Sequence, residues 1–287
     1  MPSFHELSCI QTTQGIVGDL AISPDGKQVL AIHGGFRSAN WKPVYTASFA
    51  TTEASVAPAF GRPAYISDDG VAMAIEAELK LITARVFDRR EVRAEHDLWR
   101  GDPTLENGAR LDAERVVIEF TDRDDGHGYE TPRYSTHHRT IDLSTGSSAT
   151  SDSGIARYYR GPASPLATPN QRGPFKEPKL PFRSEWPVLL GTKRFLTDKR
   201  VFDAATAAVV HELARGSTFE DLSLDEKDAL VVTQSGELQL WEVGGAEPLA
   251  RIFRIDDGFQ SARFIGATNE IVAGTTKGAV IRYALVG

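Results

Sequence analysis

Two stretches of the chain share one pattern, VFDRREVRAEHDL at residues 86–98 and VFDAATAAVVHEL at residues 201–213. In each, a Val-Phe-Asp segment is followed at the same spacing by a histidine, an acidic residue and a leucine. A third copy of the second half, His5-Glu6-Leu7, comes near the start of the sequence, where no first half precedes it. Internal repeats of this kind indicate an architecture built from copies of one supersecondary unit.

The sequence around these segments predicts a repeat unit of four short strands. An opening segment ends in a turn, as in LAISPDG at 20–26, AYISDDG at 64–70 and LSLDEKD at 222–228. An apolar run follows, then a strand with a large apolar residue near its end, and turn residues lead into a last strand. These large residues are Phe49, Phe87, Ile141, Phe202, Trp241 and Tyr283, at intervals of 38, 54, 61, 39 and 42 residues. Four strands in about 40 residues is typical of a β-propeller blade.

Helical propensity favours a different interpretation of two segments. Residues 72–99 are rich in Ala, Glu and Arg with apolar residues at helical spacing, and residues 203–216 begin and end like a capped helix. The equivalent segments ELQLWEV and AVIRYAL instead alternate in the manner of strands. Since equivalent segments of a repeat share a conformation, we expect strands throughout.

The segments ISPDGKQVLAI, VFDAATAAVVHEL and LWEV resemble the opening turn and the last hairpin of blades in WD40-like and quinoprotein-like propellers. The resemblance covers nearly the whole chain, although LWEV stands where a Trp-Asp pair is usual and no Gly-His pair precedes each unit. It implies a single all-β domain over residues 1–287, a propeller of four-stranded antiparallel blades. The markers give six blades, or seven if the long intervals hold another. In such propellers the N-terminal strand closes the ring, so FHELSCI is expected beside AVIRYALVG.

The composition is that of a globular chain without basic character. Hydrophobic residues make up 41% and charged residues 25%, and the net charge of −7 argues against broad affinity for nucleic acid. No apolar run approaches a membrane span, and MPSFHELSCI lacks the basic and apolar regions of a signal peptide. The single Cys9 excludes an intramolecular disulfide and a cysteine-cluster metal site. We therefore expect a cytoplasmic monomer that binds neither membranes nor nucleic acid.

The first long interval contains TDRDDGHGYETPRYSTHHRT, residues 121–140, expected between the second and third strands of the third blade. Its three aspartates, Asp122, Asp124 and Asp125, do not have the spacing of an EF-type calcium loop. His137 and His138 are adjacent, and adjacent strand residues point to opposite faces, so they cannot both bind one zinc ion. We expect a solvated polar hairpin tip and no metal.

The second long interval contains a proline-rich basic insertion, residues 154–187. It holds seven of the fifteen prolines and a net charge of +4, which leaves −11 for the rest of the chain. Proline removes backbone donors, so we expect a long loop, and loops of this length are often functional. The candidate partner-binding residues are Tyr158, Tyr159, Arg172, Lys176, Lys179, Phe182, Arg183 and Trp186, because arginine and aromatic residues are enriched at interface hot spots. Two alternatives are a strap packed across the acidic body and a track for single-stranded nucleic acid, which the negative charge elsewhere opposes.

Catalytic motifs are not evident. No nucleophile elbow, phosphate loop, His-Glu-x-x-His or dinucleotide fingerprint occurs, and we expect no catalytic residue and no cofactor. His5, His96 and His211 each precede a carboxylate, but their repetition indicates hydrogen bonds to neighbouring strands and not catalysis. The sequence favours a non-catalytic protein-binding module or scaffold, with an inhibitor or immunity-type protein as a special case. The alternative is a metal-dependent hydrolase or lactonase with its site at the mouth of the central channel.

Overall fold

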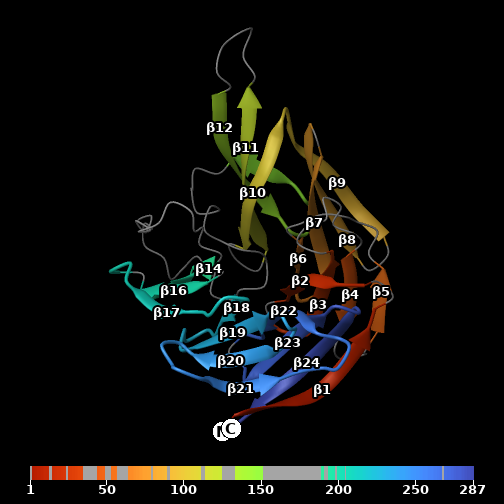
Figure 1. Cartoon of the computed structure of the whole chain (residues 1–287). Coiled ribbons are helices and arrows are strands. Elements are labelled where there is room, and N and C mark those ends of the chain that lie inside the picture. The colour runs from red at the N-terminus through yellow and green to blue at the C-terminus, as the bar shows by residue number, and fades with distance from the viewer. Residues whose placement is uncertain are drawn as a thin grey trace.

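Every element that the structure, a computed structural model, describes is a β-strand. The described residues are 2–12, 15–23, 25–34, 44–48, 53–56, 64–78, 80–88, 91–110, 114–124, 133–150, 189–190, 193–197, 199–203, 205–266 and 268–287. The strands pair into four-stranded antiparallel sheets that are arranged like the blades of a propeller (Figure 1). The two segments with helical propensity contain strands, as the repeat predicts.

Five sheets are full blades, and in all but the last of them the four strands pair in chain order from the inside outwards. The first contains β2 (Val17–Ile22), β3 (Gln28–His33), β4 (Val44–Ser48) and β5 (Glu53–Val56). The second contains β6 (Ala64–Ile66), β7 (Val71–Glu78), β8 (Leu81–Asp88) and β9 (Glu91–Arg100), and the third β10 (Pro103–Arg110), β11 (Arg115–Asp124), β12 (Arg133–Asp142) and β13 (Ser148–Thr150). Then come β18 (Ser217–Leu222), β19 (Asp228–Thr233), β20 (Leu238–Glu242) and β21 (Pro248–Ile252), and finally β22 (Phe259–Phe264), β23 (Glu270–Thr275) and β24 (Ala279–Val286) with β1 (Ser3–Gln11).

The sixth sheet is reduced in size. It pairs β14 (Leu189–Leu190), β15 (Arg194–Leu196), β16 (Arg200–Asp203) and β17 (Val209–Glu212), so none of its strands is longer than 4 residues. Its first strand follows the proline-rich insertion, whose prolines lack the backbone N–H that a strand ladder needs.

The prediction of six complete blades in a closed ring is therefore wrong. The structure has five full blades beside this reduced sheet, and the ring is not closed. Contacts between strands pass from the reduced sheet to the blade β18–β21, and from there through the last, first and second blades to the third. Among the described residues no comparable contact joins the third blade to the reduced sheet. The two long intervals hold long connections between strands, which is why they do not supply a seventh blade.

The N-terminal strand pairs with the last blade, as predicted. β1 runs antiparallel to β24, with Ser3 opposite Val286 and Gln11 opposite Ala279. The N- and C-termini consequently lie together at the bottom of Figure 1. The orphan His5-Glu6-Leu7 copy is thus the outer strand of a blade whose other three strands come from the end of the chain.

Large apolar side chains pack between adjacent blades at most of the marker positions. Phe87 is fully buried in a cluster with side chains of the first blade, and Tyr283 in a cluster with side chains of the preceding blade. Trp241 is partly buried against residues of the reduced sheet. Phe202 is also buried, but it stacks on Phe195 of its own sheet, with ring centroids 4.7 Å apart. Packing between blades is therefore observed at three of these four positions.

Candidate functional site

The first strands of neighbouring blades meet near the middle of the ring and share an irregularity. β18, β22 and β2 contact one another in succession. In each of them the pairing register shifts directly before a polar residue, Asp221, Ser261 or Asp19. A β-bulge of this kind redirects the side chain that follows it. All three polar side chains are buried, so the repeated bulge places polar groups inside the molecule between successive blades.

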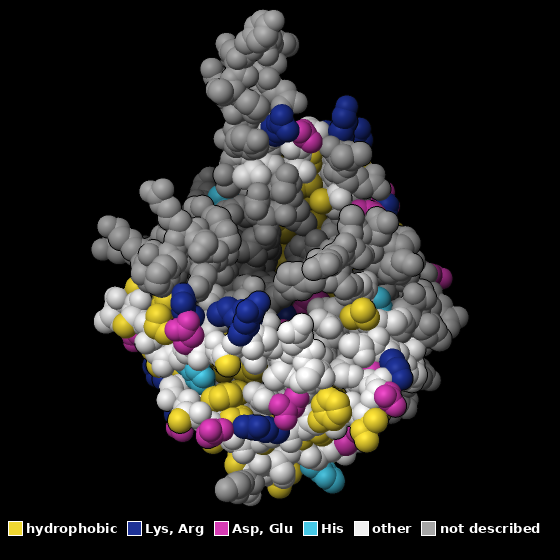
Figure 2. Space-filling view, viewed as in Figure 1, with side chains coloured by type: hydrophobic (Ala, Val, Ile, Leu, Met, Phe, Trp, Pro, Cys, Tyr) yellow, Lys and Arg dark blue, Asp and Glu magenta, His cyan; other side chains and the backbone are white. Residues whose placement is uncertain are grey.

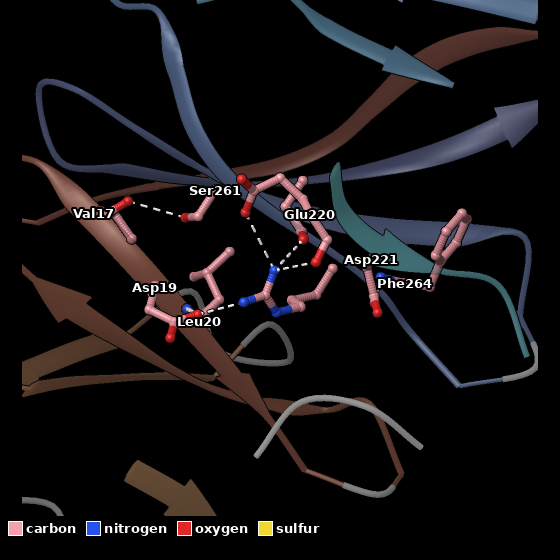
Figure 3. Close-up of polar contacts among 9 residues, drawn as sticks. Val17, Asp19, Leu20, Glu220, Asp221, Ser261 and Phe264 are labelled. Atoms are coloured by element: carbon pink, nitrogen blue, oxygen red, sulfur yellow. Dashed lines mark hydrogen bonds and ion pairs between the residues drawn. The ribbon is translucent and has the colours of Figure 1, made fainter. Parts of the chain in front are cut away.

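Arg263 forms ion pairs with carboxylates of two neighbouring blades, Asp19 and Glu220, which are labelled in Figure 3. Its Nη2 is 2.6 Å from Oδ1 of Asp19 on β2, and its Nη1 is 3.4 Å from Oε2 of Glu220 on β18. Nη1 also donates to the backbone oxygens of Glu220 and Ala262, both at 2.8 Å. The side chains of Arg263, Asp19 and Glu220 are only 5%, 2% and 9% exposed. One guanidinium therefore connects three successive blades inside the protein.

Asp221 forms a second contact across the same boundary. Its Oδ2 accepts a hydrogen bond of 2.9 Å from the backbone N–H of Phe264 on β22, whereas Oδ1 is buried without a hydrogen-bond partner. Burial raises the pKa of the Asp221 carboxyl to about 7, against the opposing effect of the nearby Arg263 guanidinium. On the other side of β22, Ser261 Oγ donates to the carbonyl of Val17 at 2.9 Å. The arrangement can hold blades together and take up a proton.

The two faces of the ring differ in their connections. The turns from first to second strand and from third to fourth strand share one face, here called the tight-turn face, and all are short. The connections from second to third strand and from each blade to the next share the opposite face. On this long-connection face lie the strand ends that are joined by residues 34–43, 57–63, 125–132 and 151–188. In the space-filling view the middle of the molecule is hollowed, with Lys and Arg side chains on the described part of its border (Figure 2).

Turns of the tight-turn face are fixed by a repeated hydrogen bond. A serine hydroxyl donates to an aspartate two residues later, in Ser23–Asp25 at 2.7 Å, in Ser67–Asp69, and in Ser223–Asp225 at 2.8 Å. In Asp69 and Asp225 this hydrogen bond is the main cause of a lowered pKa. These acidic groups are therefore committed to turn structure.

The predicted partner-binding residues lie outside the described residues. These are Tyr158, Tyr159, Arg172, Lys176, Lys179, Phe182, Arg183 and Trp186. Residues 151–188 connect β13 to β14, and the two strand ends that they join lie on the long-connection face.

Two of the three repeated histidines, His96 and His211, form the predicted hydrogen bonds to a neighbouring sheet. His96 on β9 donates from Nε2 to the carbonyl of Thr145 at 2.8 Å, in the last turn of the third blade. His211 on β17 accepts at Nδ1 from the backbone N–H of Gly244 at 3.1 Å, in the equivalent turn of the next sheet. Burial lowers the pKa of His211, which favours the neutral ring that can accept this hydrogen bond. These contacts support a structural role for both side chains.

The hairpin of the third blade is mostly strand. β11 extends to Asp124 and β12 begins at Arg133, so only its tip, residues 125–132, lies outside the described part. Asp122 Oδ1 accepts from the backbone N–H of Asp102 at 2.8 Å, and the His137 ring packs at a tilt against Trp99, with centroids 4.2 Å apart. Among the residues that the structure describes, no group of three or more His, Cys, Asp or Glu side chains is placed to hold a metal ion.

Sequence reasoning missed the buried cluster of Asp19, Glu220, Asp221 and Arg263, because its members come from three different blades. A signal was nevertheless present. Aligned on their strands, the segments VGDLAI, FEDLSL and FQSARF each have an apolar residue at the first position and a polar residue at the third.

Comparison with models of known protein families and with curated protein sequences gives no match to this chain. Within the described ranges, no helix has the length and apolar character needed to cross a bilayer.

Proposed function

We propose that this chain is a non-catalytic protein-binding module, whose partner contacts the long-connection face and the basic insertion at residues 154–187. The observation that carries the proposal is the difference between the two faces. One face has short turns fixed by internal hydrogen bonds, and the other receives every long connection. Binding residues are commonly found on loops that a rigid scaffold positions.

The described polar groups support a binding role better than a catalytic one. Arg263 and its carboxylates are directed at one another inside the protein, and His96 and His211 are engaged by neighbouring turns. We further propose a WD40-like relationship and a cytoplasmic location, which a chain with one cysteine among 287 residues fits. An inhibitor or immunity-type protein is a special case of the same module.

The insertion combines two kinds of contact that binding kinetics can separate. Its basic side chains are suited to guiding the encounter with an acidic partner, and Trp186, Phe182 and Tyr159 to forming a desolvated centre. After recovery of a partner from the host by pull-down, we expect neutral replacements of Arg172, Lys176 and Lys179 to slow association and weaken its salt dependence. Replacing Trp186 by Ala should speed dissociation, at a loss of about 2 kcal/mol or more.

Matched controls are available on the tight-turn face. Lys27 and Lys227 are exposed lysines in equivalent turns, and their neutral replacement should leave both rates unchanged.

Excision of residues 172–179 distinguishes the two interpretations of the insertion, a recognition arm and a structural strap. If the excised protein loses stability and still binds its partner, the insertion is a structural strap. Bound divalent metal in the purified protein would instead favour the hydrolase alternative.

A further inference from the structure

The contact between β18 and β22 contains a carboxyl group that is only partly satisfied. Asp221 of β18 is 1% exposed, and its Oδ2 accepts the backbone N–H of Phe264 across the blade boundary. Oδ1 of the same carboxyl is buried with no hydrogen-bond partner. A buried charge with an unpaired oxygen is costly, so the neutral form of this side chain suits its surroundings better than the ionised form.

The neighbouring charged groups do not offset the cost of ionising the buried Asp221 carboxyl. Glu220 on the same strand and Asp19 on β2 already share the Arg263 guanidinium. On the other side of β18, Arg194 and Lys199 of the reduced sheet donate to the backbone oxygens of Glu226 and Ser217. Ionisation of Asp221 would thus give the buried cluster three carboxylates around one guanidinium.

We propose that the contact between β18 and β22 is a pH-sensitive joint, which tightens as the solution becomes more acidic than neutral and loosens as Asp221 ionises. The joint, defined by Asp221, Arg263 and Phe264, connects the blade β18–β21 to the blade that contains both chain termini. A change in its strength alters how firmly this last blade is held. The inference rests on the fold and is independent of the proposed binding function.

The direction of the pH effect follows from the proton count. The pKa of Asp221 is raised by burial from 3.8 to about 7, so between these values the closed joint holds a proton that an opened joint releases. A group of this kind stabilises the closed state fully below its open-state pKa, and the stabilisation is lost as the pH rises towards 7. Between about pH 4 and pH 7 the opening equilibrium should rise by up to about tenfold per pH unit.

The amide of Phe264 reports directly on the joint, because its hydrogen bond goes to Asp221. We expect its protection against hydrogen exchange, measured by NMR and corrected for the intrinsic rate, to be about tenfold or more greater at pH 5.0 than at pH 7.5. Asp221→Asn should remove this dependence, since the amide oxygen can still accept from Phe264. Asp256→Asn, the same change at an exposed carboxylate, should leave the profile as in the wild type.

A carbon-13 NMR titration of the Asp221 carboxyl tests the proposal even if the asparagine variant does not fold. A midpoint well above that of exposed aspartates is expected. A midpoint below pH 5, or Phe264 protection that does not change between pH 5.0 and pH 7.5 in the wild type, would overturn the proposal. So would an unaltered pH profile in folded Asp221→Asn.

Discussion

Arg263 Nη2 and Asp19 Oδ1 are 2.6 Å apart across a blade boundary, and both side chains are almost fully buried. The same guanidinium contacts Glu220 on the strand of the preceding blade. Removing ions from water is expensive, and pairing compensates for it only when the hydrogen bonds are nearly complete. Asp19 also receives the N–H of Leu20 at 2.9 Å, which adds to its satisfaction. The ion pair and the hydrogen bonds around it therefore join the first strands of three successive blades.

Replacing Arg263 by Met should lower the free energy of unfolding by about 3–5 kcal/mol, because the buried carboxylates of Asp19 and Glu220 would lose their cation. Denaturant unfolding at neutral pH measures the change. Arg251→Met is the matched control, since Arg251 and its partner Glu247 are 53% and 82% exposed. Exposed pairs contribute about 1 kcal/mol or less, so equal losses in the two variants would contradict a special role for the buried pair.

Trp241 should contribute to stability through the contact between the reduced sheet and the next blade. Its ring lies 5.0 Å from the His211 ring in an edge-to-face arrangement, and its Nε1 donates to Gln239 Oε1 at 2.8 Å. Because the side chain is partly exposed, Trp241→Ala should cost about 3 kcal/mol, at the lower end of the range for large aromatic residues. Phe253→Ala, at a position 56% exposed, should cost much less in the same unfolding assay. Wild-type stability of Trp241→Ala would show that this packing is not important.

Removal of residues 1–11 should leave β24 without its outer partner along its whole length. The deletion also removes the link from Gln11 Nε2 to the carbonyl of Lys277 at 2.8 Å. We expect the melting temperature to fall by at least several degrees, as a loss of a few kcal/mol does in a domain of this size. A synthetic peptide of residues 1–12 should restore part of the loss. An unchanged melting curve would mean that the strand contributes little to the last blade.

The repeat in the sequence was sufficient to predict four-stranded blades, because in every blade but the last the four strands are consecutive in the chain. Val86-Phe87-Asp88 lies on β8 and His96 on β9, which pair with each other. The fixed number of residues between them therefore reflects one hairpin. The open ring was not predictable in this way, since closure depends on contacts between units far apart in sequence. Arg263 was missed for the same reason. Its partners Asp19 and Glu220 lie 244 and 43 residues away in the chain.

The last turns of the third blade and the reduced sheet offer a test of the repeat at single-residue level. Asp142 and Asp203 open equivalent turns, in each of which the aspartate accepts from a following threonine N–H at 2.8 Å. Four residues after the aspartate, Gly146 has a φ of 72° and Ala207 a φ of 56°. This left-handed conformation costs a residue with a Cβ about 1–2 kcal/mol.

Ala207→Gly should therefore stabilise the protein by about 0.5–1 kcal/mol, because relief of this strain exceeds the entropy that glycine adds to the unfolded chain. The reverse change, Gly146→Ala, should cost about 2 kcal/mol or more, since it combines the same strain with steric conflict. A Cβ at residue 146 would lie 2.8 Å from His96 Cδ2 and 2.9 Å from Val86 Cγ2. Thermal unfolding of the two variants measures both effects. Destabilisation by Ala207→Gly would show that the two turns are not equivalent.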